Sequence, residues 1–388
     1  MNSRLRSSYL WIALLAGYLF IALGISIQLQ DGLGLVSFKS PIRYFYDAYD
    51  VRVYFASSNW LGDLSRLYAS VPSEYPLAAN YIFLVARKIS ELLPGSIDEF
   101  RRFQFVWTAM AAFVYCTCLY VVRRLPDPKS VRLVTWLSPA IVYYSLFRFD
   151  IYVALPLMIF MLLVMRERFL LGSLALGVAI SLKGFAVVLI PALFSFVLAK
   201  RGVNFALKCV LLALAPFGVC NLVVYANTGL DGMAFPYRFH AIRSFNGQST
   251  WDAFSIQYLV NQISFLPPLV IAASSLYSFW RRPESYEDFV DCSVVAVTGF
   301  ASALVFYSPQ FILWIIAVVV FSPRKFLQYL SLLLALFTYA YFPYAADFTT
   351  AYPSQLSRDL FLVFLRTCSV ARLAIIGLCA VPAKLSRA

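Results

Sequence analysis

The sequence predicts an all-helical protein that crosses a membrane many times. Of its 388 residues, 61% are hydrophobic and only 13% are charged. A soluble domain has about a quarter charged residues, so this chain has too few to cover a water-facing surface. Its hydrophobic residues also come in long blocks separated by short basic segments, as expected for helices in lipid. No hydrophilic block is long enough for a soluble domain, so residues 1–388 are interpreted as one membrane domain.

The composition argues against two other kinds of protein. The net charge is +13, but the basic residues lie in short loops, where they set topology and face anionic lipid; we therefore expect no nucleic-acid partner. The seven cysteines are an odd number without a CxxC pair, and they are interpreted as small core residues. His240 is the single histidine, which argues against a histidine-rich metal centre.

About twelve apolar blocks are candidate membrane spans. They lie near 9–28, 103–122, 132–147, 151–165, 170–182, 185–199, 206–226, 256–280, 290–307, 310–322, 326–345 and 359–382. The first follows Arg4 and Arg6 without a small-residue cleavage site, so it is interpreted as an uncleaved span. Several blocks are shorter than the roughly 20 residues that a perpendicular helix needs. Short blocks predict local thinning of the bilayer, or helices that end at a polar cavity inside the protein.

Basic clusters recur between these blocks and predict the topology. The clusters are Arg4/Arg6, Arg123/Arg124/Lys129/Arg132, Arg166/Arg168, Lys200/Arg201/Lys208, Arg281/Arg282, Arg324/Lys325 and Lys384/Arg387. If each is cytoplasmic, every intervening block crosses once and both termini lie inside. The outer side then holds a long first loop at 29–102, a second loop at 227–255, residues 346–358 and several short turns. Such a protein fits a bacterial inner membrane.

Residues 77–93 are apolar but carry Arg87 and Lys88 in the middle. On a helix, the apolar residues of this segment share one face, and Asn80, Arg87 and Glu91 lie opposite. This pattern favours an amphipathic helix that lies in the membrane interface. A spanning helix here would place the later basic clusters on the outer side.

The first outer loop contains the leading candidate for a catalytic base. Asp50 follows a long span and precedes an aromatic-rich stretch, so its carboxylate is placed to take a proton at the membrane surface. The alternative is a solvated loop aspartate. Asp47 and Asp50 could share a divalent cation, but two carboxylates make a weak site, and no metal is assigned.

Two further candidates lie beside short spans. The turn Arg148-Phe149-Asp150 either caps helix ends through a local ion pair or aims an arginine at phosphate. Lys183 interrupts an apolar run and is the one clear deep charge that we identify. It must find an anion, water or a carbonyl, or extend to the interface.

The second outer loop and a later turn complete the set. The loop 227–255 combines His240, Arg243 and Trp251 with other aromatics, which suits sugar stacking and phosphate binding; the alternative is an interfacial aromatic belt. Ser308 and Gln310 flank Pro309, and they either satisfy carbonyls that the proline frees or bind a ligand hydroxyl. The chain has no Walker loop, GxGxxG, GxSxG or HExxH motif, so an enzyme here would use an activated lipid and no nucleotide.

Taken together, these stretches resemble glycosyltransferase family 87, whose members are polytopic mannosyltransferases with the GT-C fold. The most specific elements are Glu74-Tyr75-Pro76 and Ser308-Pro309-Gln310 ahead of Trp314, and the resemblance runs in order from about residue 40 to 320. Leu77 and Phe185 stand where the family often has proline, which leaves the exact donor and acceptor open.

The resemblance implies inverting transfer of a hexose, most often mannose, from polyprenyl phosphate to a lipid or glycolipid acceptor at the outer face. By position, Asp50 matches the general base. The cations Arg148, Lys183, His240 and Arg243 would stabilise the leaving phosphate. The remaining candidates, for the sugar or the acceptor, are Tyr54, Glu74, Tyr75, Asp150, Trp251, Ser308 and Gln310. No cofactor is implied, although a divalent ion stays open.

Two alternatives remain. A transporter or flippase for a lipid-linked sugar would have several polar residues deep in mid-span and related halves. A transferase for another polyprenyl-linked sugar, such as arabinofuranose, would share the scaffold, and residue spacing does not separate the sugars.

Overall fold

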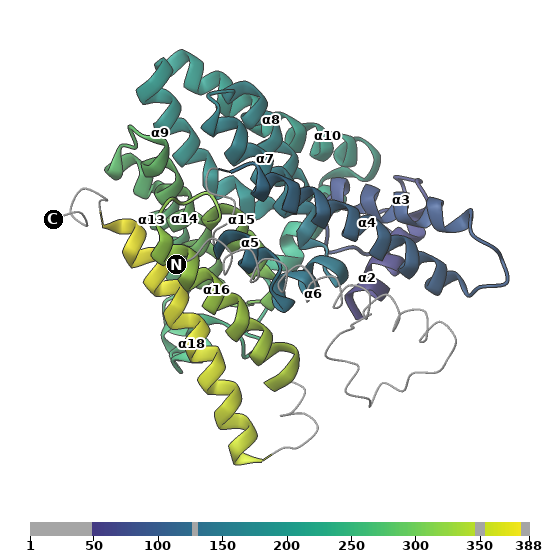
Figure 1. The fold of residues 1–388 in the computed structure, drawn as a ribbon. Helices are drawn as coiled ribbons and strands as arrows, with labels where there is room; N and C mark the ends of the chain where they lie inside the picture. The colour runs from purple at the N-terminus through teal and green to yellow at the C-terminus, as the bar shows by residue number, and fades with distance from the viewer. Residues whose placement is uncertain (1–48, 126–130, 346–353, 382–388) are drawn as a thin grey trace, which may run out of the picture.

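The computed structural model describes residues 49–125, 131–345 and 354–381. Every named element in these ranges is a helix (Figure 1). The predicted span at 9–28 and Asp47 lie outside the described residues. The all-helical prediction is therefore confirmed for the part of the chain that the structure describes.

Among the described residues, ten helical elements precede the longest helix. These are α2 (Tyr49–Ser57), η2 (Ser58–Trp60), α3 (Leu77–Glu91), α4 (Glu99–Arg123), α5 (Val131–Trp136), α6 (Pro139–Phe147), α7 (Asp150–Met165), α8 (Phe169–Leu182), η3 (Gly184–Leu189) and α9 (Ile190–Arg201). The remaining elements are α10 (Val203–Ala241), α11 (Thr250–Ala253), α12 (Gln257–Gln262), α13 (Leu266–Arg281), α14 (Tyr286–Ala303), η4 (Pro309–Phe311), α15 (Ile312–Val319), α16 (Lys325–Tyr339), η5 (Ala340–Ala345) and α18 (Gln355–Ala380).

The chain is an integral membrane protein with several long apolar helices. Among the described residues, five helices are long and apolar enough to cross a bilayer, or six if the bent pair α6 and α7 is one span. Of the twelve spans expected from the apolar blocks, eleven fall at least partly in the described residues, and the observed count is well below that. The difference arises because several blocks form short helices: α8 and α15 have 14 and 8 residues, and α6 meets α7 at a bend of 111°. These breaks carry the charged residues discussed below.

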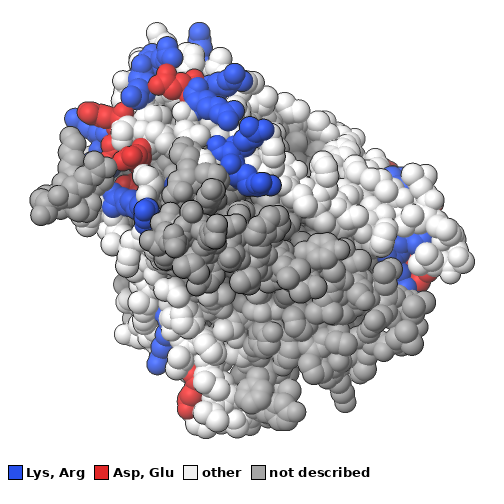
Figure 2. Space-filling view, in the orientation of Figure 1, with Lys and Arg blue, Asp and Glu red and all other residues white. Residues whose placement is uncertain are grey.

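Charged side chains gather mainly at the upper left of the visible surface, with smaller groups at its right and lower left edges, and the described surface between them is largely uncharged (Figure 2). Ion pairs join three of the predicted basic clusters to neighbouring helices, between Arg201 and Glu167 at 3.5 Å, Arg281 and Asp288 at 2.6 Å, and Arg324 and Asp291 at 2.5 Å. Large apolar side chains are exposed along α10, α13 and α18, as expected for helices that face lipid.

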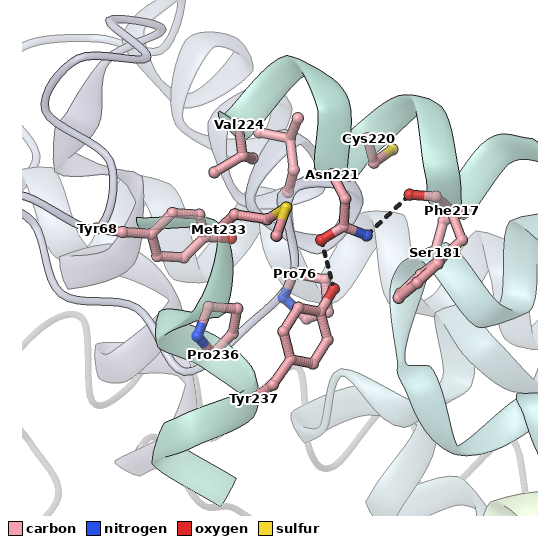
Figure 3. Close-up of a pocket in the computed structure, with 11 residues that line it drawn as sticks. Tyr68, Pro76, Ser181, Phe217, Cys220, Asn221, Val224, Met233, Pro236 and Tyr237 are labelled. Carbon is pink, nitrogen blue, oxygen red and sulfur yellow. Dashed lines mark hydrogen bonds between the residues drawn. The ribbon is translucent and has the colours of Figure 1, made fainter. Parts of the chain in front are cut away.

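Helix α10 folds back on itself. Gly229 has a φ of +70°, a conformation that glycine adopts without steric cost, and it separates two helical segments. The Tyr237 hydroxyl donates a hydrogen bond to Asn221 Oδ1 at 2.9 Å (Figure 3). This contact joins the returning segment to the first one and lines a pocket with Tyr68 and Met233. The fold-back brings the end of α10 toward the segment that precedes α3, where His240 Nε2 lies 3.0 Å from the Glu74 carbonyl oxygen.

Helix α3 coincides with the predicted amphipathic segment. Tyr81, Val85 and Ile89 are 43%, 47% and 42% exposed, whereas Asn80 and Arg87 are buried. The Asn80 amide donates to the Tyr75 carbonyl at 2.7 Å, and Arg87 pairs with Glu99. An exposed apolar face over a buried polar one is expected for a helix whose outer side meets lipid. Its orientation in the membrane stays a prediction.

Helices α8 and α10 pack closely at Gly177. A Cβ atom added there would lie 2.7 Å from the Ala213 carbonyl oxygen and 2.8 Å from Pro216 Cδ. We therefore expect Gly177→Ala to force the helices apart and to destabilise the fold by about 1–3 kcal/mol. Unfolding of the purified protein in detergent measures this. The control is Gly218→Ala, where nothing lies within 4 Å; that change should be neutral, or stabilising by up to about 1 kcal/mol. Equal effects of the two substitutions would contradict the packing argument.

Candidate functional site

The turn between α6 and α7 is the centre of the candidate site. Arg148 has extended backbone, with φ −124° and ψ 148°, and Asp150 lies in the first turn of α7. Both side chains are inside the protein, since Arg148 is 4% exposed and Asp150 is fully buried. Buried charges in a membrane protein are costly unless they are paired, and each of the two has an ionic partner from another element.

Arg148 pairs with the predicted base. Its Nη1 lies 3.0 Å from Asp50 Oδ2. The Asp50 side chain is 23% exposed and the Arg148 side chain only 5%. The carboxylate in the first turn of α2 therefore keeps access to the surface, while the guanidinium holds it from behind.

Asp150 holds Lys183 and Trp314. Its Oδ1 accepts hydrogen bonds from Lys183 Nζ at 2.8 Å and from Trp314 Nε1 at 2.5 Å. Lys183 follows the last residue of α8 in extended conformation, so its side chain leaves the helix at the break. Trp314 is stacked between Phe185 and Phe311, with ring centroids 3.7 and 3.9 Å apart. The full burial of Asp150 favours a role in holding Lys183 over direct contact with a sugar.

A third ion pair joins the segment before α3 to the segment that follows α10. Arg243 pairs with Glu74, and its guanidinium lies over the rings of Phe239 and Phe306, 4.8 and 4.1 Å from their centroids. His240 Nε2 lies 3.0 Å from the Glu74 carbonyl oxygen. The structure thus brings His240 and Arg243 to the first loop, as the sequence analysis required for one shared site.

Electrostatics connect the Glu74 pair to the rest of the site. Burial raises the pKa of the Glu74 carboxyl, while Arg243 and Lys183 lower it and Asp50 raises it again. The net direction is upward, because desolvation disfavours the charged form more than the two cations favour it. Glu74 therefore interacts with Lys183 and Asp50 as well as with Arg243, and the three ion pairs form one cluster.

The aromatic candidates are less accessible than expected. Tyr54 is fully buried, stacks on Phe83 at 4.9 Å between ring centroids, and accepts a hydrogen bond from the Phe149 amide at 2.9 Å. Tyr75 is also buried and meets Tyr54 edge to face. Both rings form a wall behind the ion pairs, because neighbouring aromatic side chains cover their faces.

Trp251 lies on α11, where its Nε1 donates to the Ala303 carbonyl at 2.9 Å. Its ring is buried, so in this structure it packs within the fold. The prediction that Tyr54, Tyr75 and Trp251 stack on a sugar requires a rearrangement of these side chains.

Ser308 and Gln310 border the site from the turn that precedes α15. The Ser308 carbonyl accepts a hydrogen bond from the Phe311 amide at 3.0 Å, and Gln310 is buried. This turn sets the position of Trp314. The neighbouring Tyr307 is fixed from the second loop, because Asn246 Nδ2 donates to its carbonyl at 2.5 Å.

Two residues were not predicted from the sequence. Trp314 received no role, although it belongs to the Ser-Pro-Gln element. The prediction that Lys183 is the one clear deep charge is wrong, because Arg372 in α18 is fully buried. The signal was available, since Arg372 interrupts the apolar block 359–382.

This arrangement suits proton transfer beside an anion. One partly exposed carboxylate, Asp50, lies next to the buried cation Arg148. In the described ranges, no group of three or more His, Cys, Asp or Glu side chains is placed to hold a metal ion.

Comparisons with known proteins do not assign the chain to a family. No family model, no curated protein and no solved structure matches the chain.

The raised pKa of Glu74 gives a prediction for stability against pH. A carboxyl with a raised folded-state pKa binds protons more tightly when folded, so its contribution to stability is lost as pH rises from about 4.5 through the folded pKa. Glutamine does not titrate, so Glu74→Gln does not lose stability in this way. We therefore expect the difference in unfolding temperature, variant minus wild type, to become more positive as the pH rises through this range.

Thermal unfolding of both proteins between pH 4.5 and 7.5 measures the effect. Glu91→Gln, at an exposed glutamate of α3, is the control and should show a smaller trend. A trend of the opposite sign for Glu74→Gln would mean that the ion pair with Arg243 outweighs burial.

Proposed function

We propose that this protein is an inverting glycosyltransferase that moves a hexose, which the resemblance indicates is mannose, from polyprenyl phosphate to a lipid or glycolipid acceptor. The observation that carries the proposal is the position of Asp50, which is partly exposed and lies beside the buried cation Arg148. The reaction needs a base and a phosphate-binding cation side by side. The resemblance to glycosyltransferase family 87 supports the same assignment.

The proposed reaction is a single displacement. Asp50 accepts the proton of the acceptor hydroxyl while the hydroxyl oxygen of the acceptor attacks the anomeric carbon. The bond between that carbon and the phosphate oxygen breaks, and the phosphate leaves with the electron pair. Arg148 and Lys183 stabilise the charge that develops on the leaving phosphate. Attack opposite to the leaving group inverts the configuration of the sugar.

The resting ion pairs fit this role. Without a donor, Arg148 and Lys183 are neutralised by Asp50 and Asp150. A donor phosphate would compete for both cations, and its interaction with Arg148 would release Asp50 toward the acceptor. The fully buried Asp150 would remain in place and keep Lys183 aimed at the phosphate.

The donor is proposed to be a lipid because the site belongs to a membrane protein and the sequence lacks nucleotide-binding motifs. Arg243 and His240, from the end of α10, would close the site over the phosphate or the sugar. On the topology of the basic clusters, the site faces outward, and a bacterial inner membrane fits. A different polyprenyl-linked sugar, such as arabinofuranose, would use the same groups.

The first test is sugar transfer by the purified full chain in nanodiscs, with radiolabelled polyprenyl-phosphate-mannose and a membrane lipid extract. Asp50→Asn should lower the transfer rate by roughly 10²–10⁴-fold and retain donor binding, because it removes the base and leaves the cations. Asp63→Asn, at an exposed aspartate of the same loop, is the control and should be fully active.

Full activity of Asp50→Asn would exclude Asp50 as the base. Absence of labelled product with wild type would call for other polyprenyl-linked sugars. Failure with the whole panel would overturn the proposed function.

A second prediction concerns the support of Lys183. Trp314→Phe keeps an aromatic ring between Phe185 and Phe311 but removes the hydrogen bond to Asp150. Hydrogen bonds to charged groups contribute about 1.5–3 kcal/mol, so we expect the donor KM to rise on the order of tenfold. Trp136→Phe is a matched control, because Trp136 is fully buried and its Nε1 has no hydrogen-bond partner in the described part of the chain. An equal change in KM for both variants would contradict a specific role for Trp314.

A further inference from the structure

Arg372 is a buried arginine that the proposed reaction does not use. It lies near the middle of α18 and has no exposed surface. Its Nη2 donates to the hydroxyls of Thr250 and Ser369 at 3.1 and 3.0 Å. Its guanidinium also lies 4.2 Å from the centroid of the Tyr307 ring. Among the described residues, no carboxylate forms an ion pair with Arg372.

The surroundings of Arg372 leave hydrogen-bonding groups unused. Its Nε and Nη1 are buried, and neither has a hydrogen-bond partner in the ranges that the structure describes. The hydroxyl of the neighbouring Tyr307 is buried beside the same guanidinium, and Arg372 is the one described group with which it interacts as a hydrogen-bond partner. A buried cation without a carboxylate is strongly unfavourable in a membrane protein. Two unused guanidinium donors and a hydroxyl beside them are a suitable arrangement for an anion.

This group is separate from the ion-pair cluster. Tyr307 lies between them: it follows Phe306, which packs on Arg243, and its own ring packs on Arg372. Gln248 and Thr250 reach the Arg372 side from the second loop, where Gln248 Oε1 lies 3.4 Å from the Tyr341 hydroxyl. The loop that contributes Arg243 to the first site therefore also contributes to the second.

The position of α18 favours a lipid as the source of the anion. Val363, Val370 and Leu373 are exposed, at 55%, 54% and 45%, so the helix that carries Arg372 presents apolar side chains outward. A lipid beside this helix would have its tails on the apolar surface and only its head group to place inside.

We propose that Arg372, Tyr307 and Thr250 form a binding subsite for the anionic phosphate head group of a lipid. The guanidinium pairs with the phosphate oxygens, and the Tyr307 hydroxyl donates to one of them. Binding at this subsite does not depend on the proposed transfer reaction. Only the identification of this lipid as the sugar acceptor rests on the proposed function, and it follows because Arg148 and Lys183 are assigned to the donor phosphate.

The test is thermal unfolding of the purified full chain in maltoside micelles, with phosphatidylglycerol, phosphatidylcholine or inorganic phosphate added. Phosphatidylglycerol should raise the unfolding temperature of wild type more than the other two additions do. Arg372→Met should lose this difference. Without lipid it should be at least as stable as wild type, because an uncompensated buried charge has been removed.

Two control variants separate this subsite from other cations. Arg366→Met changes an exposed arginine of the same helix that donates to the Ala253 carbonyl at 2.9 Å, and it should respond to phosphatidylglycerol as wild type does. Lys183→Met changes the proposed donor site and should also keep the response. Neither measurement uses a sugar donor, so failure of sugar transfer and failure of this proposal are distinguishable.

Three outcomes would overturn the proposal. A response of Arg372→Met equal to that of wild type would exclude the subsite. If inorganic phosphate stabilised wild type as much as phosphatidylglycerol does, the ligand of the subsite would be a free anion and not a lipid. If Arg372→Met does not fold, Arg372→Lys takes its place; it keeps the charge but loses the planar fork, and an undiminished response to phosphatidylglycerol would then exclude the subsite.

Discussion

The candidate site depends on the partners that neutralise the two buried charges of the turn Arg148–Asp150. Arg148 reaches Asp50 on α2, the Phe149 amide donates to Tyr54, and Asp150 receives Lys183 and Trp314. One bend of 111° between α6 and α7 thus fixes groups from three other places in the fold: α2, the end of α8 and α15. Because a charge inside a membrane protein is stable only with a partner, Arg148 and Asp150 each constrain the elements that neutralise them.

The broken helices follow from the same constraint. Lys183 leaves α8 where its backbone is extended, and Trp314 is placed by the turn that begins at Pro309. In unbroken spans these side chains would be distributed along the helix axes, and they would not converge on Asp150. Short helices that end inside the protein provide this convergence, and the freed backbone groups are tolerated there because protein, not lipid, surrounds them.

Much of the candidate site was predictable because unusual residues are conspicuous in an apolar sequence. Asp50, Arg148 and Lys183 were identified from their positions relative to apolar blocks, and Arg243 was identified from the cations and aromatic residues around it. The structure places all four in one cluster. The pairing of these residues was not predictable, because partners such as Asp150 and Lys183 are far apart in the chain. The burial of Tyr54 and Tyr75 was also missed, since aromatic residues line both interfaces and protein cores.

The sequence by itself determined that this is a helical membrane protein, because 61% hydrophobic residues in long blocks leave lipid as the only fitting solvent. It also determined the amphipathic character of α3, since local periodicity decides which side chains share a helix face. Only the tertiary structure decided which apolar blocks are bent or short and which carboxylate neutralises each cation. It also showed that Arg372 has no carboxylate partner among the residues that the structure describes. Those features depend on contacts between distant segments, and the fold alone brings such segments together.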